Sequence, residues 1–276
     1  MTKSNSRFTR ILSTVLSIML VSMLLCFNSA AFAEGEKTKV SIGIGNAYPP
    51  FCYVDEDENI AGYDYETLCL VADMLSDKYE FKFTADAFGN LLIGLDTGTY
   101  DIAAHHFGYT EQRAENYLYG TVVNMYAGYF LIGYVKGRTD IVDMASLEGK
   151  TVATHPGSMA ETLILQRLEE NPDHQFDIEY IESGNNEVLY SGLMNGLYDA
   201  YIATRFDLNT FNAPYDNFME YTDSHVSEVN SGTLFLYPKG HDELQQDVDA
   251  ALQTLLDNGK LAEVSIEMLG DDYTHK

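Results

Sequence analysis

The sequence predicts an α/β fold of two similar lobes, and an internal repeat is the main observation behind this prediction. Residues 91–101 and 189–199 both read L-x-x-G-L-x-x-G-x-Y-D. In each copy two leucines share one helical face, the second glycine falls where a helix ends, and Tyr-Asp opens an apolar run typical of a buried strand. Because solenoids stack many short units, two copies in 276 residues instead predict two lobes facing a groove.

Strand and helix patterns alternate along the rest of the chain. A strand is expected at 40–44, a helix at 64–75 with Asp64 as its N-cap, and a strand at 81–84. Later elements are an apolar strand-like run at 126–134 that leaves the first lobe, a strand at 151–154, a helix from 158, a strand at 229–236 and a helix at 244–255 ending near Gly259. This β-α-β order predicts parallel sheets with right-handed crossovers.

The first 33 residues have the pattern of a secretory signal peptide. Lys3, Arg7 and Arg10 precede an uncharged run from 11 to 27, and Ala31-Phe32-Ala33 supplies the small residues of a cleavage site. We expect cleavage after Ala33 and a periplasmic or extracellular location. The alternative is an uncleaved leader that tethers the protein to the membrane, since no later stretch is long and apolar enough to cross a bilayer.

The chain is strongly acidic, with 42 Asp and Glu against 16 Lys and Arg. The leader carries three of the basic residues and no acidic one, so its removal changes the formal charge from −26 to −29. Such a surface repels nucleic acid and anionic lipid, and neither is expected as a partner. The mature chain keeps Cys52 and Cys69. Export permits a disulfide between them, but the sequence leaves that open, and the cysteine and histidine spacing predicts no metal site.

Four strand ends are expected to meet at the groove, because ligands of open α/β sheets bind beyond the carboxyl ends of the strands. These ends are Gly45–Tyr48, His105–Arg113, His155–Ser158 and Ala203–Asp207. His105 and His106 are adjacent on a strand, so one of the two rings is expected to face the groove. Arg113 is predicted to bind a carboxylate there, with neutralisation of Glu111 or Glu115 as the alternative.

These segments resemble the solute-binding proteins of polar amino-acid ABC transporters (solute-binding protein family 3) over almost the whole mature chain. The motifs that carry the resemblance are Val40–Phe51, Ile60–Asp64, Phe88–Leu91 leading into Tyr100-Asp101, the T-x-x-R motif at Thr110–Arg113, and Leu147–Ala153 followed by Gly157-Ser158. Within the family, His105–Gly108 and Arg205-Phe206 lean toward the cystine-type branch.

The resemblance implies a periplasmic binding protein-like fold of type II, with two α/β lobes joined by a two-strand hinge. It places a signal peptide at 1–33, a discontinuous first lobe at 34–128 and 230–276, and a second lobe at 129–229. It also implies a set of ligand-binding residues: Tyr48, Phe88, His106, Gly108, Arg113, Ser158, Thr204 and Arg205.

Each of these residues has an implied role. Arg113 would clamp the ligand α-carboxylate through a bidentate pair. Gly108 and Ser158 would add backbone N–H groups, and Ser158 also its hydroxyl. The rings of Tyr48 and Phe88 would enclose the ligand side chain. His106 would offer a polar group to the ligand amine, and Thr204 would add a contact that favours closure.

Three positions leave the ligand open. Thr204 stands where the family usually has an aspartate that holds the ligand ammonium; either Asp207 or another groove carboxylate compensates, or the ligand lacks a free α-ammonium. Gly45 stands where the family often has an acidic or polar side chain, which disfavours lysine or arginine as the ligand. Arg205 either meets a second carboxylate or lies on the surface.

The sequence therefore predicts the extracytoplasmic substrate-binding component of an ABC importer. It would capture a polar amino acid or a similar small carboxylated solute by closing its lobes, and deliver it as a monomer to a membrane permease. No catalytic residue, cofactor or metal is expected, since the chain has no plausible nucleophile–base pair and no G-x-x-x-x-G-K phosphate loop. Two alternatives are a dehydratase on the same fold, with His106 or groove acids as catalyst, and a module that reports its ligand to a membrane receptor.

Overall fold

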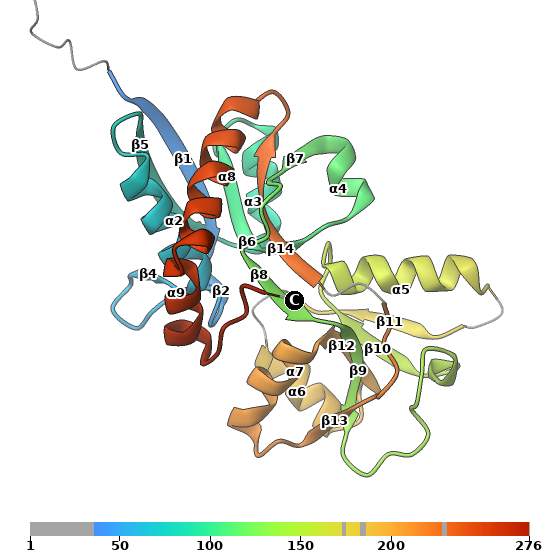
Figure 1. Ribbon diagram of the computed structural model, residues 1–276. Coiled ribbons are helices and arrows are strands. Elements are labelled where there is room, and N and C mark those ends of the chain that lie inside the picture. The colour runs from blue at the N-terminus through green and yellow to red at the C-terminus, as the bar shows by residue number, and fades with distance from the viewer. Residues whose placement is uncertain (1–35, 173–174, 183–185, 228–230, 276) are drawn as a thin grey trace, which may run out of the picture. The chain divides into compact units, whose positions relative to one another are not determined.

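Two mixed β-sheets, one in each lobe, organise the chain from Thr38 onwards (Figure 1). The computed structural model describes residues 36–172, 175–182, 186–227 and 231–275. The predicted signal peptide and its cleavage site lie outside the described residues. In the described ranges, no helix has both the length and the apolar character that a bilayer crossing requires.

The sheet of the first lobe has six strands. These are β1 (Thr38–Gly45), β5 (Tyr79–Asp86), β6 (Ile102–Gly108), β7 (Tyr117–Tyr119), β8 (Met125–Gly128) and β14 (Ser231–Pro238). Their order is β5-β1-β6-β14-β7, and β8 pairs with β14 as well. β1 is parallel to β5 and β6, whereas β14 is antiparallel to β6, β7 and β8. An additional small sheet of β2 (Ala47–Tyr48), β3 (Cys52–Val54) and β4 (Ile60–Ala61) carries Tyr48.

The sheet of the second lobe has five strands. These are β9 (Phe130–Val135), β10 (Thr151–Thr154), β11 (Asp177–Tyr180), β12 (Ala200–Thr204) and β13 (Met219–Tyr221). Their order is β11-β10-β12-β9-β13, with β10 parallel to β11 and β12, and β9 antiparallel to β12 and β13. The predicted parallel pairing is thus confirmed for β1, β5 and β6 and for β10, β11 and β12, but each sheet also contains antiparallel strands that the sequence analysis did not predict. The parallel strands follow one another through helical crossovers, whereas β14 and β9, at which the chain enters a sheet from the other lobe, pair antiparallel with their neighbours.

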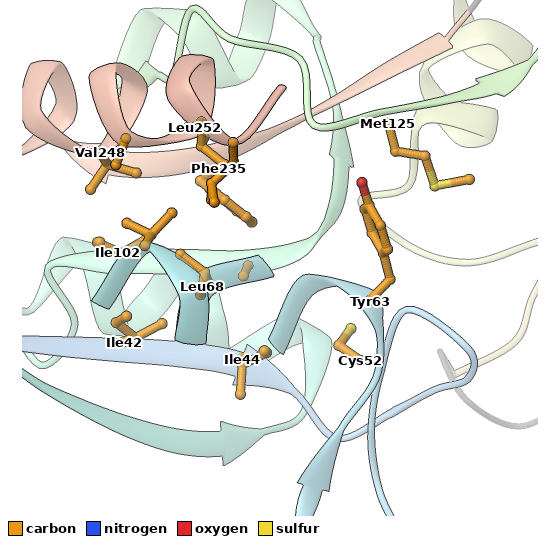
Figure 2. Packing of buried hydrophobic residues seen from close by; sticks show 14 of the residues in the cluster. Ile42, Ile44, Cys52, Tyr63, Leu68, Ile102, Met125, Phe235, Val248 and Leu252 are labelled. Atoms are coloured by element: carbon orange, nitrogen blue, oxygen red, sulfur yellow. The ribbon is translucent and has the colours of Figure 1, made fainter. Parts of the chain in front are cut away.

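The described helices flank these sheets. They are α2 (Tyr63–Met74), α3 (Phe88–Asp96), α4 (Glu111–Asn116), α5 (Met159–Glu170), α6 (Asn186–Met194), α7 (Arg205–Asn212), α8 (Asp242–Asp257) and α9 (Lys260–Leu269), with 3-10 turns at Ala145–Leu147 and Ala213–Tyr215. Successive residues of β6 serve opposite faces. Ile102 packs with Leu68 of α2 and Val248 of α8, as Figure 2 shows, whereas Ala103 packs with Leu91 of α3. Helices thus cover both faces of this sheet.

The repeat encodes the same helix-to-strand connection in both lobes. A Cβ atom added to Gly94 would fall 2.1 Å from the Tyr100 ring, and one added to Gly192 would fall 2.0 Å from the Tyr198 ring. The first glycine of the motif therefore makes room for its tyrosine to lie against the helix. The second glycine of each copy adopts a left-handed φ, 69° and 71°, which confirms the predicted helix ends.

The closing aspartate of the repeat ties each new strand to its parallel neighbour. Asp101 accepts hydrogen bonds from the N–H of Ser41 (2.7 Å) and from its hydroxyl (2.8 Å). Asp199 accepts one from the N–H of Thr151 at 2.9 Å. Ser41 lies on β1 and Thr151 on β10, so the two copies perform the same task in the two sheets.

The prediction that Asp64 caps α2 is wrong. The helix begins at Tyr63 after Gly62, whose φ is 112° and whose added Cβ would lie 2.5 Å from the Phe51 carbonyl oxygen. The tight turn lets the N–H groups of Tyr63 and Asp64 donate to the carbonyls of Pro50 (3.0 Å) and Phe51 (2.8 Å), so no side-chain cap is needed. The Asp64 side chain is buried instead.

The predicted run at 126–134 is split between two sheets. β8 belongs to the first sheet and β9 to the second, with Gly128 at a φ of 87° next to the break. The chain returns between the end of β13 at 221 and the start of β14 at 231, a segment that includes residues outside the described part. The lobe boundaries at 128/129 and 229/230 stay a prediction. Cys52 and Cys69 are both free thiols.

Candidate functional site

One cavity brings together the strand ends that the sequence analysis selected. It encloses about 800 Å³ of empty space, part of which is open to solvent. Its lining residues are Tyr48, Phe88, His105, His106, Phe107, Gly108, Arg113, Phe130, Thr154, His155, Ser158, Met159, Ala160, Asn186, Tyr201, Ile202, Ala203, Thr204 and Asp207. All four predicted strand ends contribute, and the wall combines residues of both sheets. A concave site between two lobes, with apolar walls and a few polar groups, is where small ligands usually bind.

Arg113 is a buried guanidinium on this wall, 7 % exposed. One Nη donates to the Gly108 carbonyl at 3.1 Å and the other to the Gly157 carbonyl, which lies just before α5 in the other lobe. In the described part of the chain no carboxylate forms an ion pair with it, and Glu111 and Glu115 are both exposed. The guanidinium therefore spans the groove while its charge stays unneutralised by the protein.

Asp207 places a carboxylate on the same wall. Its Oδ1 accepts a hydrogen bond from the Tyr48 hydroxyl at 2.9 Å, and its Oδ2 accepts one from the Thr204 hydroxyl at 2.7 Å. Burial raises the pKa of Asp207, although both hydroxyl donors act to lower it. Among the described lining residues, Arg113 is the one guanidinium and Asp207 the one carboxylate.

Three histidines give the cavity a neutral polar lining near pH 7. Burial lowers the pKa of His105 and of His106 to about 3, and burial also lowers the pKa of His155. Both His105 and His106 line the cavity, and which of the two rings faces the groove stays a prediction. His106 has a φ of 51°, and this left-handed backbone breaks the alternation of an extended strand.

Asp64 binds the backbone of His106. The His106 N–H donates to Asp64 Oδ2 at 2.7 Å, and the His106 ring stacks on Phe51 with 3.8 Å between ring centroids. Both ring nitrogens are buried and, within the described residues, neither has a hydrogen-bond partner. Burial raises the pKa of Asp64 to about 7. The imidazole is thus fixed in orientation and still able to donate and accept one hydrogen bond each.

The other predicted site residues differ in the groups that they present to the cavity. Tyr48 and Phe88 both line the cavity and both contact His105, with ring centroids 5.1 and 4.5 Å away. Ser158 lines it too, but its hydroxyl oxygen accepts the Glu161 N–H at 3.1 Å and its own N–H donates to a carbonyl at 3.2 Å. Ser158 therefore serves as the N-cap of α5 in this structure.

Arg205 is the predicted site residue that the structure does not bring to the cavity. Its side chain is exposed and lies over the Tyr221 ring of β13, with 5.7 Å between Cζ and the ring centroid. Arg205 is the first residue of α7. Its side chain leaves the helix on a different face from the side chain of Asp207, which lines the cavity.

Several lining residues were not selected from the sequence. These are His105, Phe107, Phe130, Thr154, His155, Met159, Ala160, Asn186, Tyr201, Ile202 and Ala203, while Asp207 was named only as an alternative partner for a ligand ammonium. His105, His155 and Asp207 lie within the predicted strand ends, so their positions were the available signal. The apolar members come from buried segments, where sequence alone does not separate a cavity wall from a core. Within the described ranges, no three His, Cys, Asp or Glu side chains gather as a metal site would require.

A family model described as bacterial extracellular solute-binding proteins, family 3, matches residues 40–271. The chain belongs to this family. The L-cystine-binding protein TcyK of Bacillus subtilis (strain 168) is 32 % identical over 85 % of each chain. A putative L-cystine ABC transporter structure from Listeria monocytogenes has 28 % identity and a TM-score of 0.78, over 86 % of this chain and 98 % of that one. The probable amino-acid ABC transporter extracellular-binding protein ytmK of Bacillus subtilis has 29 % identity and a TM-score of 0.70, over 86 % and 100 %.

These comparisons confirm the predicted family and the type II periplasmic binding protein fold. They also confirm the prediction of a solute-binding protein of an ABC importer and favour it over a dehydratase on the same fold. Its relatives are proteins that bind substrates outside the cytoplasm.

Proposed function

We propose that this family 3 protein captures L-cystine, or a closely related amino acid, outside the cytoplasm and passes it to the permease of an ABC importer. The observation that supports this proposal most directly is the buried Arg113, whose positive charge has no carboxylate partner in the described part of the chain. A ligand carboxylate would supply the missing negative charge through a bidentate pair. The cystine-binding relatives favour L-cystine as the first ligand to test.

The carboxylate would take the place of the Gly157 carbonyl as a partner of Arg113 and so connect the two lobes through the ligand. Tyr48, Phe88 and His106 would surround the rest of the ligand, while Gly108, Ser158 and Thr204 complete the wall. Because these groups come from both lobes, a ligand that contacts all of them binds the closed arrangement more tightly and shifts the population toward it. Capture and release involve no covalent step.

The remaining sequence predictions belong to this proposal. The leader at 1–33 would direct export, the lobes would be 34–128 with 230–276 and 129–229, and the mature protein would act as a monomer. No cofactor and no metal would take part. A receptor-coupled sensor stays the alternative to import.

A thermal-shift screen followed by titration calorimetry tests the ligand. The exported protein would be screened with L-cystine, the other common L-amino acids, small peptides and dicarboxylates. A ligand present at 100 times its Kd adds about 2.7 kcal/mol to the free energy of unfolding, enough to raise Tm by several degrees. We expect the largest rise with L-cystine. The absence of a shift with every amino acid, or turnover of a cyclic carboxylate, would contradict the proposal.

Uptake measurements separate import from sensing. Cells that lack the protein should lose uptake of labelled L-cystine and regain it when the protein is restored. Normal uptake in such cells, together with tight binding in vitro, would favour the sensor.

A further inference from the structure

The backbone of Gly157 is bound on both of its sides. Its carbonyl oxygen accepts a hydrogen bond from Arg113 of the first lobe, and its N–H donates to Glu161 Oε2 of α5 at 2.5 Å. A Cβ added to Gly157 would lie 3.6 Å from the Phe88 ring, so this glycine packs against the first lobe. The two hydrogen bonds together fix the direction in which the Gly157 carbonyl points.

The turn that carries Gly157 has the features of a type II turn. The Ser158 N–H donates to the His155 carbonyl at 3.2 Å, and the two residues between them are Pro156 and Gly157, the second with a φ of 73°. Proline followed by a glycine with positive φ is typical of this turn type. Glu161 therefore binds the N–H of the central peptide, and the next carbonyl along the chain is the one that reaches Arg113.

Ordinary capping of α5 does not account for the position of the Glu161 side chain. Ser158 is the N-cap, and its Oγ accepts the Glu161 N–H at 3.1 Å. In a capping box the Glu161 carboxylate would bond back to the Ser158 N–H. Here it instead binds the N–H of Gly157, one residue earlier. The carboxylate thus stabilises the conformation of the turn, beyond what the helix end requires.

The Gly157 carbonyl uses a donor that a ligand carboxylate needs. Arg113 donates one Nη to the Gly108 carbonyl and the other to the Gly157 carbonyl. A bidentate pair with a carboxylate takes two parallel N–H groups of the guanidinium, so the ligand has to displace the Gly157 carbonyl. Every bond that stabilises the ligand-free position of this carbonyl then counts against binding, as far as the ligand breaks it.

We propose that Glu161 is a positioning residue that lowers the affinity for the ligand, because it holds the Gly157 carbonyl on Arg113 while the cavity is empty. This inference rests on the proposed function and adds an internal competitor to it. When the ligand leaves, the carbonyl returns to the guanidinium, so the buried charge of Arg113 keeps a hydrogen-bond partner throughout the cycle. The competitor therefore favours release to the permease.

Replacement of Glu161 by Ala tests the inference by a gain of affinity. Titration calorimetry of the exported protein with L-cystine should give a Kd that is lower by about fivefold. This change corresponds to the net contribution of one ordinary hydrogen bond, which applies because Glu161 is partly exposed. Glu161→Gln keeps an acceptor for the Gly157 N–H without the charge, so its Kd should fall between those of wild type and Glu161→Ala.

Stability and affinity should change in opposite directions. The Tm of ligand-free Glu161→Ala should fall, because an acidic side chain in the first turn stabilises a helix. A purely structural role of Glu161 predicts weaker binding together with the lower Tm, whereas the competitor predicts tighter binding. X-ray scattering of the ligand-free variant should also give a larger radius of gyration, since the Arg113–Gly157 bond between the lobes is weakened.

Glu169→Ala is the matched control. Glu169 is an exposed residue of the same helix and lines, together with Glu161, a second cavity that adjoins the first at Arg113. In the described part of the chain it forms no hydrogen bond with the turn at 155–158. Its loss removes the same charge from the same region, so its Kd for L-cystine should stay within about twofold of the wild type.

The outcomes separate this inference from the proposed function. Unchanged or weaker L-cystine binding by Glu161→Ala, an unchanged radius of gyration, or an equal gain in Glu169→Ala overturns the role of Glu161 and leaves the carrier function standing. Wild-type protein that binds no amino acid overturns the proposed function, and the affinity role of Glu161 with it.

Discussion

At the scale of single residues, burial decides which charges are available to a ligand. Arg113 and Asp207 are both nearly inaccessible, yet their hydrogen-bond partners in the protein are neutral carbonyls and hydroxyls. Surface pairs such as Arg138 with Asp140, by contrast, neutralise each other at 2.7 Å. Charges that the fold buries without neutralising them are therefore the ones to which a charged ligand can add stability.

Replacement of Arg113 by Ala should abolish tight binding. Loss of one partner from a buried charged pair costs about 2–5 kcal/mol, so Kd should rise about 30-fold or more. Arg205→Ala is the control, because Arg205 is exposed, lies over Tyr221 and does not line the cavity. Calorimetry with L-cystine checks both variants. An Arg113→Ala protein whose affinity stays within a few-fold of the wild type would refute the carboxylate clamp.

Asp64 should give the fold a distinct pH dependence. Burial raises its pKa from 3.8 to about 7, so the folded protein binds a proton that the unfolded chain has lost between these values. The contribution of Asp64 to stability is full below pH 4 and is lost as the pH rises to 7, at about 1.4 kcal/mol per pKa unit. Asp64→Asn keeps an acceptor for the His106 N–H and removes the titration. The free energy of unfolding of the variant, relative to the wild type, should therefore increase by a few kcal/mol between pH 4 and pH 8.

Urea unfolding at several pH values measures this difference. The buried His105 and His106 act in the opposite direction, since their lowered pKa values make stability fall as the pH drops below 6.5. Both histidines are present in wild type and variant, so their contribution cancels in the comparison. Asp73→Asn, at an exposed position of the same helix, should leave the pH profile unchanged. A constant difference between Asp64→Asn and wild type would contradict the expectation.

Residue-scale sequence reasoning placed Arg113 on the cavity wall, where the structure has it, but it missed the local backbone of His106 and the burial of Asp64. An arginine at a strand end in an acidic chain is visible as an anomaly in the sequence. The left-handed backbone of His106 is not visible in the sequence, because it depends on a hydrogen bond to Asp64, 42 positions earlier in the chain. The same contact explains why Asp64 is buried and does not cap its helix.

At the scale of elements, the repeat shows how a short motif can specify a connection. Its leucines, its left-handed glycine and its strand were all readable from spacing, and the structure confirms them. The role of the first glycine was not readable, since it depends on a tyrosine ring folding back across the helix. The aspartate likewise acts on a strand that lies elsewhere in the sequence.

Addition of a methyl group at the first glycine should destabilise each lobe. In Gly94→Ala and Gly192→Ala the new Cβ would fall 2.1 and 2.0 Å from a tyrosine ring, so the ring or the helix must move. Overpacking of this kind costs about 1–3 kcal/mol. Chemical denaturation of each variant measures the loss.

Gly89→Ala supplies the control within the same helix as Gly94. No atom lies within 4 Å of the Cβ added at Gly89, so the substitution should leave stability unchanged or raise it by up to about 1 kcal/mol through helix propensity. Equal stability of Gly94→Ala and Gly89→Ala would show that the tyrosine does not depend on the glycine for space.

At the scale of the whole molecule, the cavity depends on contacts between residues that are far apart in the sequence. Tyr48 and Asp207 are 159 positions apart, and Arg113 reaches the Gly157 carbonyl across 44 positions. The sequence predicted that the four strand ends converge, because strand ends in parallel α/β units share one edge. It could not predict which side chains pair across the groove, since that depends on how the two lobes dock.

Tyr48→Phe should loosen the ligand-free closed arrangement. The Tyr48 hydroxyl donates to Asp207 across the lobes at 2.9 Å, and a hydrogen bond to a charged group contributes about 1.5–3 kcal/mol. Its loss leaves the Asp207 carboxylate with the Thr204 hydroxyl as its side-chain donor, so closing without a ligand becomes less favourable and the closed-to-open ratio should fall about tenfold or more. X-ray scattering of the ligand-free variant should give a larger radius of gyration than the wild type. Added L-cystine should restore compaction, because a ligand that contacts both lobes favours the closed arrangement.

Tyr109→Phe tests whether any lost phenol has this effect. Tyr109 is 52 % exposed and does not line the cavity, so its variant should scatter like the wild type with and without ligand. Identical ligand-free curves for Tyr48→Phe and wild type would mean that the Tyr48–Asp207 bond does not hold the lobes together. Closure would then depend on the ligand and on Arg113, whose bond to the Gly157 carbonyl is the other cross-lobe hydrogen bond described above.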